Sequence, residues 1–196
     1  MDLTILPMVK SALTAGGVEI GTGLNGYLQD LITQYSATVQ LELNRKTEQT
    51  ERTELYDHAA GQRYTYLYAY PVLADPVVEV RTSLDGTFTD DPVSDISIDY
   101  LEGRIWWRGA LPPAGMGTVQ VKYAGGMAPN TDAFVSAYPD IALAIDQQIT
   151  YFYQRKDSLG STSVSIEGGS IAFQSAVEWI PALKAMVDKH QRILYV

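Results

Sequence analysis

The spacing of apolar residues changes from helical to strand-like near Lys46 and returns to helical after residue 127. In the two outer regions, apolar residues recur every three or four positions, which is the period of one face of an α-helix. In the middle region, short alternating runs rich in aromatic and β-branched residues end at Gly, Pro and Asp, as β-strands do. We therefore expect an α+β fold, in which a small helical bundle carries an inserted antiparallel β-rich region. The expected parts form one compact domain with an insertion and comprise residues 1–46, 47–127 and 128–196.

Residues 138–157 have the clearest helical pattern, and we expect the other helices to pack around them. The apolar positions, at spacings of four, four and three, are Ile141, Ile145, Ile149 and Phe152. Pro139 suits the first helical turn because the N–H that it lacks would be unpaired there, and Asp140 complements the positive end of the helix dipole. Three further helices are expected, at residues 4–14, 24–44 and 176–194, the last interrupted near Pro181.

Six strands are expected in the inserted region, with turns at positions such as Gly61 and Pro71. They are Thr50–Asp57, Arg63–Tyr70, Val77–Thr82, Ile96–Tyr100, Arg104–Arg108 and Thr118–Ala124. The fourth and fifth strands read as a tight hairpin, because Gly103 supplies the positive φ that such a turn needs. A smaller hairpin is expected nearer the C-terminus, with strands at 164–166 and 171–173 about Gly168-Gly169.

Two adjacent tryptophans, Trp106 and Trp107, point to opposite faces of their expected strand, because side chains alternate along a strand. Both cannot lie in the core of a sheet with one buried face, so we expect a helix or a neighbouring subunit to cover one of them. The expected strand Arg63–Tyr70 carries a row of tyrosines on one face: Tyr64, Tyr66, Tyr68 and Tyr70. On the long helix, Tyr151 and Tyr153 add two bulky rings. The candidate subunit interface therefore comprises Tyr151, Tyr153, Trp106 and Trp107, with stacking on a sugar or base as an alternative.

The formal charge of −9 is spread unevenly along the chain. From Asp75 to Glu102 the sequence has eight acidic residues and Arg81 as the one base, a net charge of −7. Such a charge repels phosphate, so it argues against tight, sequence-reading contact of this region with DNA. The last expected helix has the opposite balance, with Lys184, Lys189, His190 and Arg192.

The sequence contains no recognisable pattern for catalysis, a cofactor or a metal. There is no cysteine, and the two histidines, His58 and His190, lie far apart in polar surroundings, which argues against a zinc site. Residues 21–26 match G-x-G-x-x-G as letters, but no strand precedes them, so a dinucleotide site is not expected. We therefore expect no enzymatic activity and no cofactor. No long apolar run and no signal-peptide pattern are present, so neither a membrane span nor secretion is expected.

The order of these elements resembles the head–tail connector proteins of tailed phages, which are also called adaptor or head-completion proteins. The resemblance in plan covers most of the chain: two N-terminal helices, an inserted run of strands, and a helix after the last strand. The segments most similar to the family are Val121–Gly126 and Pro139–Arg155, with Met8, Val9, Lys10, Leu13, Leu28, Leu31 and Ile32 similar to its first two helices. The chain differs from small family members in its long β-rich middle.

The resemblance implies a structural virion protein without enzymatic activity, assembled as a dodecameric ring below the portal protein. Such a ring extends the DNA channel without reading DNA sequence and offers a platform to a stopper or tail-completion protein. It would lie in the virion neck, between capsid and tail, and assemble in the host cytoplasm. In that family the C-terminal segment docks into the portal, which here corresponds to residues 180–196, with candidate portal-binding residues Lys184, Lys189, Arg192, Ile193 and Leu194.

Two other functions remain open from the sequence. The chain could be another neck or tail-completion protein, such as a stopper or a terminator. It could also be a β-rich ligand-binding module that uses Trp106, Trp107 and the row of tyrosines.

Overall fold

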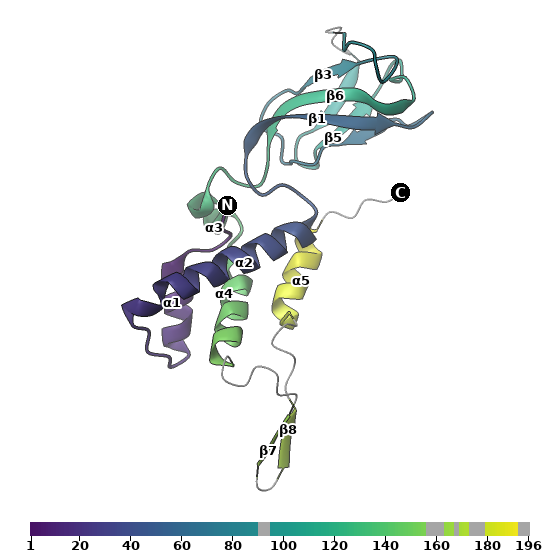
Figure 1. The fold of residues 1–196 in the computed structure, drawn as a ribbon. Helices are drawn as coiled ribbons and strands as arrows, with labels where there is room; N and C mark the ends of the chain where they lie inside the picture. The colour runs from purple at the N-terminus through teal and green to yellow at the C-terminus, as the bar shows by residue number, and fades with distance from the viewer. Residues whose placement is uncertain (90–94, 156–162, 167–168, 173–178, 192–196) are drawn as a thin grey trace. The chain divides into compact units, whose positions relative to one another are not determined.

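A computed structural model describes residues 1–89, 95–155, 163–166, 169–172 and 179–191 (Figure 1). The chain forms two compact units. A helical unit contains residues 1–44 and 131–196, and a strand unit contains residues 45–130. The mixed α+β composition and the antiparallel strand pairing that the sequence predicts are confirmed.

The helical unit has five α-helices in its described residues. They are α1 (Leu6–Ala15), α2 (Asn25–Leu43, after a 3-10 turn at Thr22–Leu24), α3 (Thr131–Ala137), α4 (Pro139–Gln154) and α5 (Pro181–His190). A two-stranded hairpin between α4 and α5 consists of β7 (Ser163–Ile166) and β8 (Gly169–Ala172). Asn44 ends α2 in the left-handed conformation at φ 49°, which asparagine tolerates better than most residues.

Helix α4 is the centre of the helical unit, because the other four helices all pack against it. Its expected apolar stripe is buried, with Ile141, Ile145 and Ile149 fully inaccessible to solvent. Phe152 is only half-buried and meets the ring of Tyr35 edge-on, with ring centroids 6.2 Å apart. The period read from the sequence therefore identifies the buried face of this helix.

The strand unit contains two three-stranded antiparallel sheets. One has the order β1-β6-β3, with β1 at Thr50–His58, β6 at Gly115–Gly125 and β3 at Val77–Val80. The other has the order β2-β5-β4, with β2 at Tyr64–Tyr66, β5 at Arg104–Trp107 and β4 at Ile96–Asp99. The expected hairpin is confirmed, since Asp99 pairs with Arg104 and Gly103 has a φ of 60°.

The two sheets share one apolar core. Both contribute to a single cluster of buried side chains: Tyr56, Leu67, Ala69, Val72, Val78, Ile105, Trp107, Val119, Val121 and Tyr123. Each sheet thus buries one face against the other, as in a small β-sandwich.

A partly buried hydrogen-bond network links β1 and β6 to the segment that follows β2. The carboxylate of Glu54 accepts hydrogen bonds from the hydroxyls of Tyr56 and Tyr123. These hydroxyls in turn accept backbone N–H bonds from Tyr68 (3.2 Å) and Ala69 (2.9 Å). Burial, together with the nearby carboxylate, raises the pKa of both tyrosines above its ordinary value, so both remain protonated donors.

Three expectations about the elements need correction. The strand expected at 63–70 is only Tyr64–Tyr66. The N–H of Leu67 still bonds in register to the carbonyl of Gly103 (2.8 Å), but the N–H groups of Tyr68 and Ala69 donate to tyrosine hydroxyls instead. The row of four tyrosines is therefore broken: Tyr70 is buried beneath the guanidinium of Arg45, which lies 3.8 Å from its ring centroid. Helix α3 was not expected. Helix α5 begins at Pro181 and ends at His190, and residues 176–178 and 192–194 of the expected helix lie outside the described residues.

Candidate functional site

Helix α5, the described part of the predicted portal-docking segment, is fixed to α4 near both of its ends. At its C-terminal end, Lys189 and His190 contact the carboxylate of Asp140 in the first turn of α4, at 2.7 and 2.9 Å. At its N-terminal end, the backbone N–H of Ile180 donates to the side-chain oxygen of Gln148, at 2.8 Å. Lys189 is thus paired within its own chain, whereas the sequence predicted it as a portal contact.

The surroundings of Asp140 favour the ionised form of its carboxyl group. Burial by itself would raise its pKa, but hydrogen bonds from His190 and Lys189 outweigh that effect and hold the pKa well below its ordinary range. The ring of His190 also meets Tyr138 edge-on, with centroids 5.9 Å apart. The ionised carboxylate contacts both Lys189 and His190 and so positions the last turn of α5.

Asp140→Asn is expected to lower the free energy of unfolding of the helical unit by about 1 kcal/mol near neutral pH, because the partly exposed ion pair is lost. Because the folded pKa is lowered, this contribution is present above the ordinary pKa of 3.8 and is lost as the pH falls further. Thermal unfolding followed by circular dichroism at pH 7 and pH 3 measures the difference. A double-mutant cycle with Lys189→Met isolates the pair, and a coupling energy of zero would contradict the assignment.

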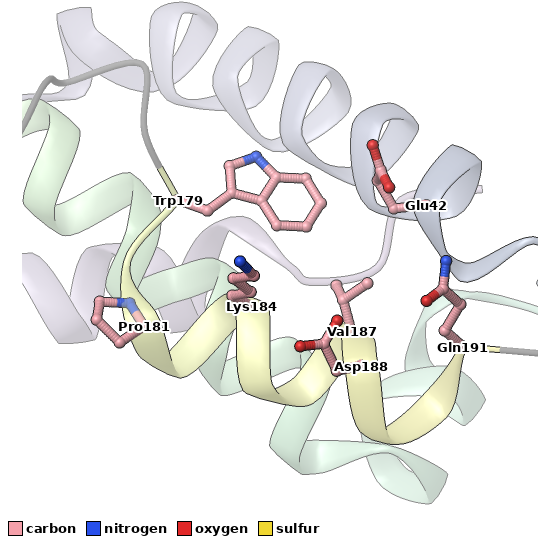
Figure 2. Close-up of a pocket in the computed structure, with 7 residues that line it drawn as sticks. All are labelled: Glu42, Trp179, Pro181, Lys184, Val187, Asp188 and Gln191. Atoms are coloured by element: carbon pink, nitrogen blue, oxygen red, sulfur yellow. The ribbon is translucent and has the colours of Figure 1, made fainter. Parts of the chain in front are cut away.

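A groove lies between α5 and the C-terminal end of α2 (Figure 2). Its volume is about 520 Å³, and its lining residues are Glu42, Trp179, Pro181, Lys184, Val187, Asp188 and Gln191. The indole of Trp179 lies between the two helices, and Val187 is buried below it. Glu42, Lys184 and Asp188 place charges of both signs around this apolar floor. An apolar floor with a charged rim is suited to receiving a protein side chain.

The second candidate surface is the outward face of the β2-β5-β4 sheet. Three rings form a cluster there, with Tyr64 5.3 Å from Tyr66 and 5.5 Å from Trp106 between centroids. The guanidinium of Arg104 lies 4.7 Å from the ring centroid of Trp106 and forms a 3.0 Å ion pair with Glu102. Trp106 is 39% exposed. Exposed aromatic rings beside arginine are the residue types most enriched at the centres of protein interfaces.

The four residues predicted at the subunit interface differ in accessibility. Trp107 is 2% exposed and its indole N–H donates to the hydroxyl of Thr65 (3.2 Å), so its side chain belongs to the core. Tyr153 is 6% exposed and lies 6.4 Å from Tyr27 between ring centroids. Tyr151 is half-buried, with Arg155 over its ring and bonded to its hydroxyl. Only Trp106 and Tyr151 have side chains open to solvent, and the interface itself remains a prediction.

Sequence reasoning found Lys184 but missed the groove beside it. Trp179, two residues before the proline that starts α5, is a local signal of an apolar anchor. Glu42 gives no such signal, because it lies far from α5 in the sequence. Arg192, Ile193 and Leu194, also predicted to bind the portal, lie outside the described residues.

The described residues contain no group of three His, Cys, Asp or Glu side chains that could hold a metal ion. The two histidines lie in different units, and burial lowers the pKa of His58, which packs edge-on against Trp107. Within the same described ranges, no helix has the length and apolarity that crossing a membrane requires.

Comparison with known proteins gives a likeness of fold. No protein-family model and no curated protein sequence matches the chain. Among solved structures, a chain in the neck of an empty gene transfer agent (GTA) particle, computed with C6 symmetry, is similar with a TM-score of 0.57 and 14% identity. Chains in the native GTA virion (TM-score 0.53) and in the native GTA neck computed with C12 symmetry (0.51) are each 15% identical. Each comparison covers 100% of this chain and 96% of the other.

Proposed function

We propose that this chain is a structural neck protein of a phage-like particle, and that it forms the adaptor ring attached below the portal. The observation that carries the proposal is the likeness of fold over the full length to chains from GTA necks solved with C6 and C12 symmetry. A protein with this role acts by assembling into a structure and not by catalysing a reaction. Its copies pack side by side around an axis, and closure of the ring covers surfaces that a single copy leaves exposed.

The electrostatics of the chain support a passive DNA channel. The net charge of −9 disfavours retention of a phosphate backbone, so DNA would pass without sequence-specific binding. The adaptor would then present its far side to a stopper or tail-completion protein. The alternative within the class of structural neck proteins is that the chain is a stopper or a terminator.

The portal contact is proposed for the C-terminal segment. Helix α5, which precedes residues 192–196 in the sequence, is anchored on α4 by Asp140 and Gln148 and lines the groove. These residues read RILYV and combine one positive charge with apolar side chains. Together with Lys184 on the groove rim, these apolar and basic side chains are complementary to a portal surface that has apolar pockets and acidic groups.

Replacement of both Ile193 and Leu194 by Asp is expected to weaken portal binding at least about a hundredfold, because two apolar side chains would no longer be buried. The chain and the portal protein encoded with it are mixed, and binding is followed by co-sedimentation or interferometry. Leu101→Asp, at a residue 78% exposed in the strand unit, is the control and should bind as the wild type does. Unchanged binding by the double variant would remove the C-terminal segment from the portal contact.

A ligand-binding function is the candidate from a different class, and the ring cluster of Tyr64, Tyr66 and Trp106 favours it. Since Trp107 is buried, the exposed aromatic surface that could bind a ligand is smaller than the sequence predicts. Tryptophan fluorescence that responds to a sugar, and is lost in Trp106→Ala, would favour this function over the ring.

A further inference from the structure

The long strand β1 has an open edge whose backbone groups are available for pairing. It is an outer strand of the β1-β6-β3 sheet and runs over nine residues, Thr50–His58. The opposite edge of the same sheet is partly covered, because the N–H of Thr89 donates to the carbonyl of Val80 on β3 (3.1 Å). In the other sheet, the outer strands β2 and β4 have three and four residues. β1 is therefore the longest outer strand in the described part of the strand unit.

Hydrogen bonds on β6 determine which backbone groups of β1 are open. The carbonyls of Thr118 and Ala124 accept bonds from Arg81 and Leu73, both at 2.9 Å and both on the β3 side. In an antiparallel sheet, alternate residues direct their N–H and C=O groups to opposite sides. Val119 and Val121, which alternate with them, therefore bond towards β1.

The register then identifies the open positions. Val119 and Val121 pair with Tyr56 and Glu54, so the even-numbered residues of β1 bond to β6. The intervening residues direct their backbone N–H and C=O groups away from the sheet: Glu51, Thr53 and Leu55. Within the described part of the chain, no hydrogen bond to these three backbone positions lies on the open side. Their side chains are exposed, Leu55 at 53%.

Among the described residues, the strands of the hairpin β7–β8 pair with each other, and neither forms an extensive backbone contact with another helix or strand. An isolated two-stranded hairpin is marginally stable in water and is normally stabilised by a third strand or by packing. Ile166 pairs with Gly169, and two residues separate them in the sequence. The closing pair of a hairpin with this spacing is hydrogen-bonded, so the alternate positions have backbone groups that point away from the hairpin. These are Ser163 and Ser165 on β7, and Ser170 and Ala172 on β8.

We propose that the β7–β8 hairpin of one copy adds to the open edge of β1 in a second copy, forming a continuous sheet across the subunit boundary. The strands of the hairpin carry no charged residue, so they can lie beside Glu51 and Asp57 without like-charge repulsion. Main-chain pairing supplies the affinity in this kind of strand addition. The two patches are different, so the contact is head-to-tail and repeats around a ring. Pairing of β1 with β1 would instead form a two-fold dimer.

The inference rests on the proposed ring and names its subunit contact. It is tested with two single-cysteine chains, Leu55→Cys and Ser165→Cys, because the natural chain has no cysteine. A disulfide between these two chains is necessarily intermolecular. After mild oxidation over a range of concentrations, we expect the mixture to give a disulfide-linked dimer on a non-reducing gel that neither variant forms alone. Ser170→Cys replaces Ser165→Cys in a parallel mixture that tests the other edge of the hairpin. Val77→Cys, 55% exposed on β3, is the control partner that should not cross-link.

A second variant tests the pairing through the backbone. Thr53→Pro removes an N–H that bonds to nothing within its own sheet, and proline is tolerated on an outer strand. We expect Thr53→Pro to have the same circular dichroism spectrum as the natural chain but to lose assembly. Thr53→Ala, which keeps the N–H, should assemble normally. The inference is overturned if neither hairpin variant forms the heterodimer at any concentration, or if Thr53→Pro assembles as the natural chain does. Rings that persist without the cross-link refute this contact but leave the proposed function standing.

Discussion

Trp107→Ala is expected to lower the free energy of unfolding of the strand unit by about 3–5 kcal/mol, the usual cost of deleting a buried large aromatic side chain. Trp107 is among the largest fully buried side chains, and it contacts His58 on β1 and Thr65 on β2, one residue from each sheet. Its removal leaves a cavity and takes the donor from the hydroxyl of Thr65. It also exposes the buried ring of His58, whose nitrogens have no hydrogen-bond partner in the described residues.

The matched control is the neighbouring residue. Trp106→Ala removes the same atoms from the outward face, so we expect a loss below about 1 kcal/mol. Guanidinium unfolding followed by circular dichroism measures both variants against the natural chain. Equal losses for the two would contradict the assignment of the inner and outer faces of β5.

The stability of the helical unit is expected to fall as the pH rises from 4 to 7.5, because of one buried carboxyl group. Asp146 is 1% exposed and accepts a 2.6 Å hydrogen bond from the hydroxyl of Thr4. Burial raises its pKa from 3.8 to about 6, against the smaller opposing effect of Thr4. Between these two values the folded state holds a proton that the unfolded state has lost, so stability decreases with rising pH. The expected decrease is about 3 kcal/mol, since each pKa unit is worth about 1.4 kcal/mol.

Asp146→Asn isolates this effect, because the other titrating groups are the same in both proteins. The difference in unfolding free energy between the variant and the natural chain should shift by about 3 kcal/mol in favour of the variant from pH 4 to pH 7.5. Unfolding by urea at each pH measures it. Asp30→Asn, at an exposed position on α2, is the control and should show no such shift. A pH-independent difference for Asp146→Asn would show that the carboxyl group titrates normally.

The elements predicted well from the sequence have a periodicity long enough to be read locally. The stripe of Ile141, Ile145 and Ile149 identifies α4 and its buried face. Helix α3 has only seven residues, of which Phe134 alone is buried, so no periodic pattern can develop. The predicted strand at 63–70 was too long, because the alternation of tyrosines continues in the sequence after Tyr68 and Ala69 have left the strand pairing to bond with tyrosine hydroxyls.

The candidate surfaces were less predictable because they depend on distant segments. Alternation places Trp106 and Trp107 on opposite faces, but which of them is buried depends on where the second sheet packs. The groove joins Glu42 to α5, and the ion pair of Lys189 depends on Asp140. Neither pairing has a local pattern, so the sequence alone does not show that Lys189 forms an ion pair with Asp140.

Negative-stain electron microscopy of the purified chain, alone and mixed with its portal protein over a range of concentrations, tests the proposed function most directly. We predict rings with a central hole, in which class averages show cyclic symmetry and the mass corresponds to a dodecamer. If the chain assembles only on its portal, the same ring should appear as an added layer below the portal. Particles that remain single chains under both conditions would contradict the proposal.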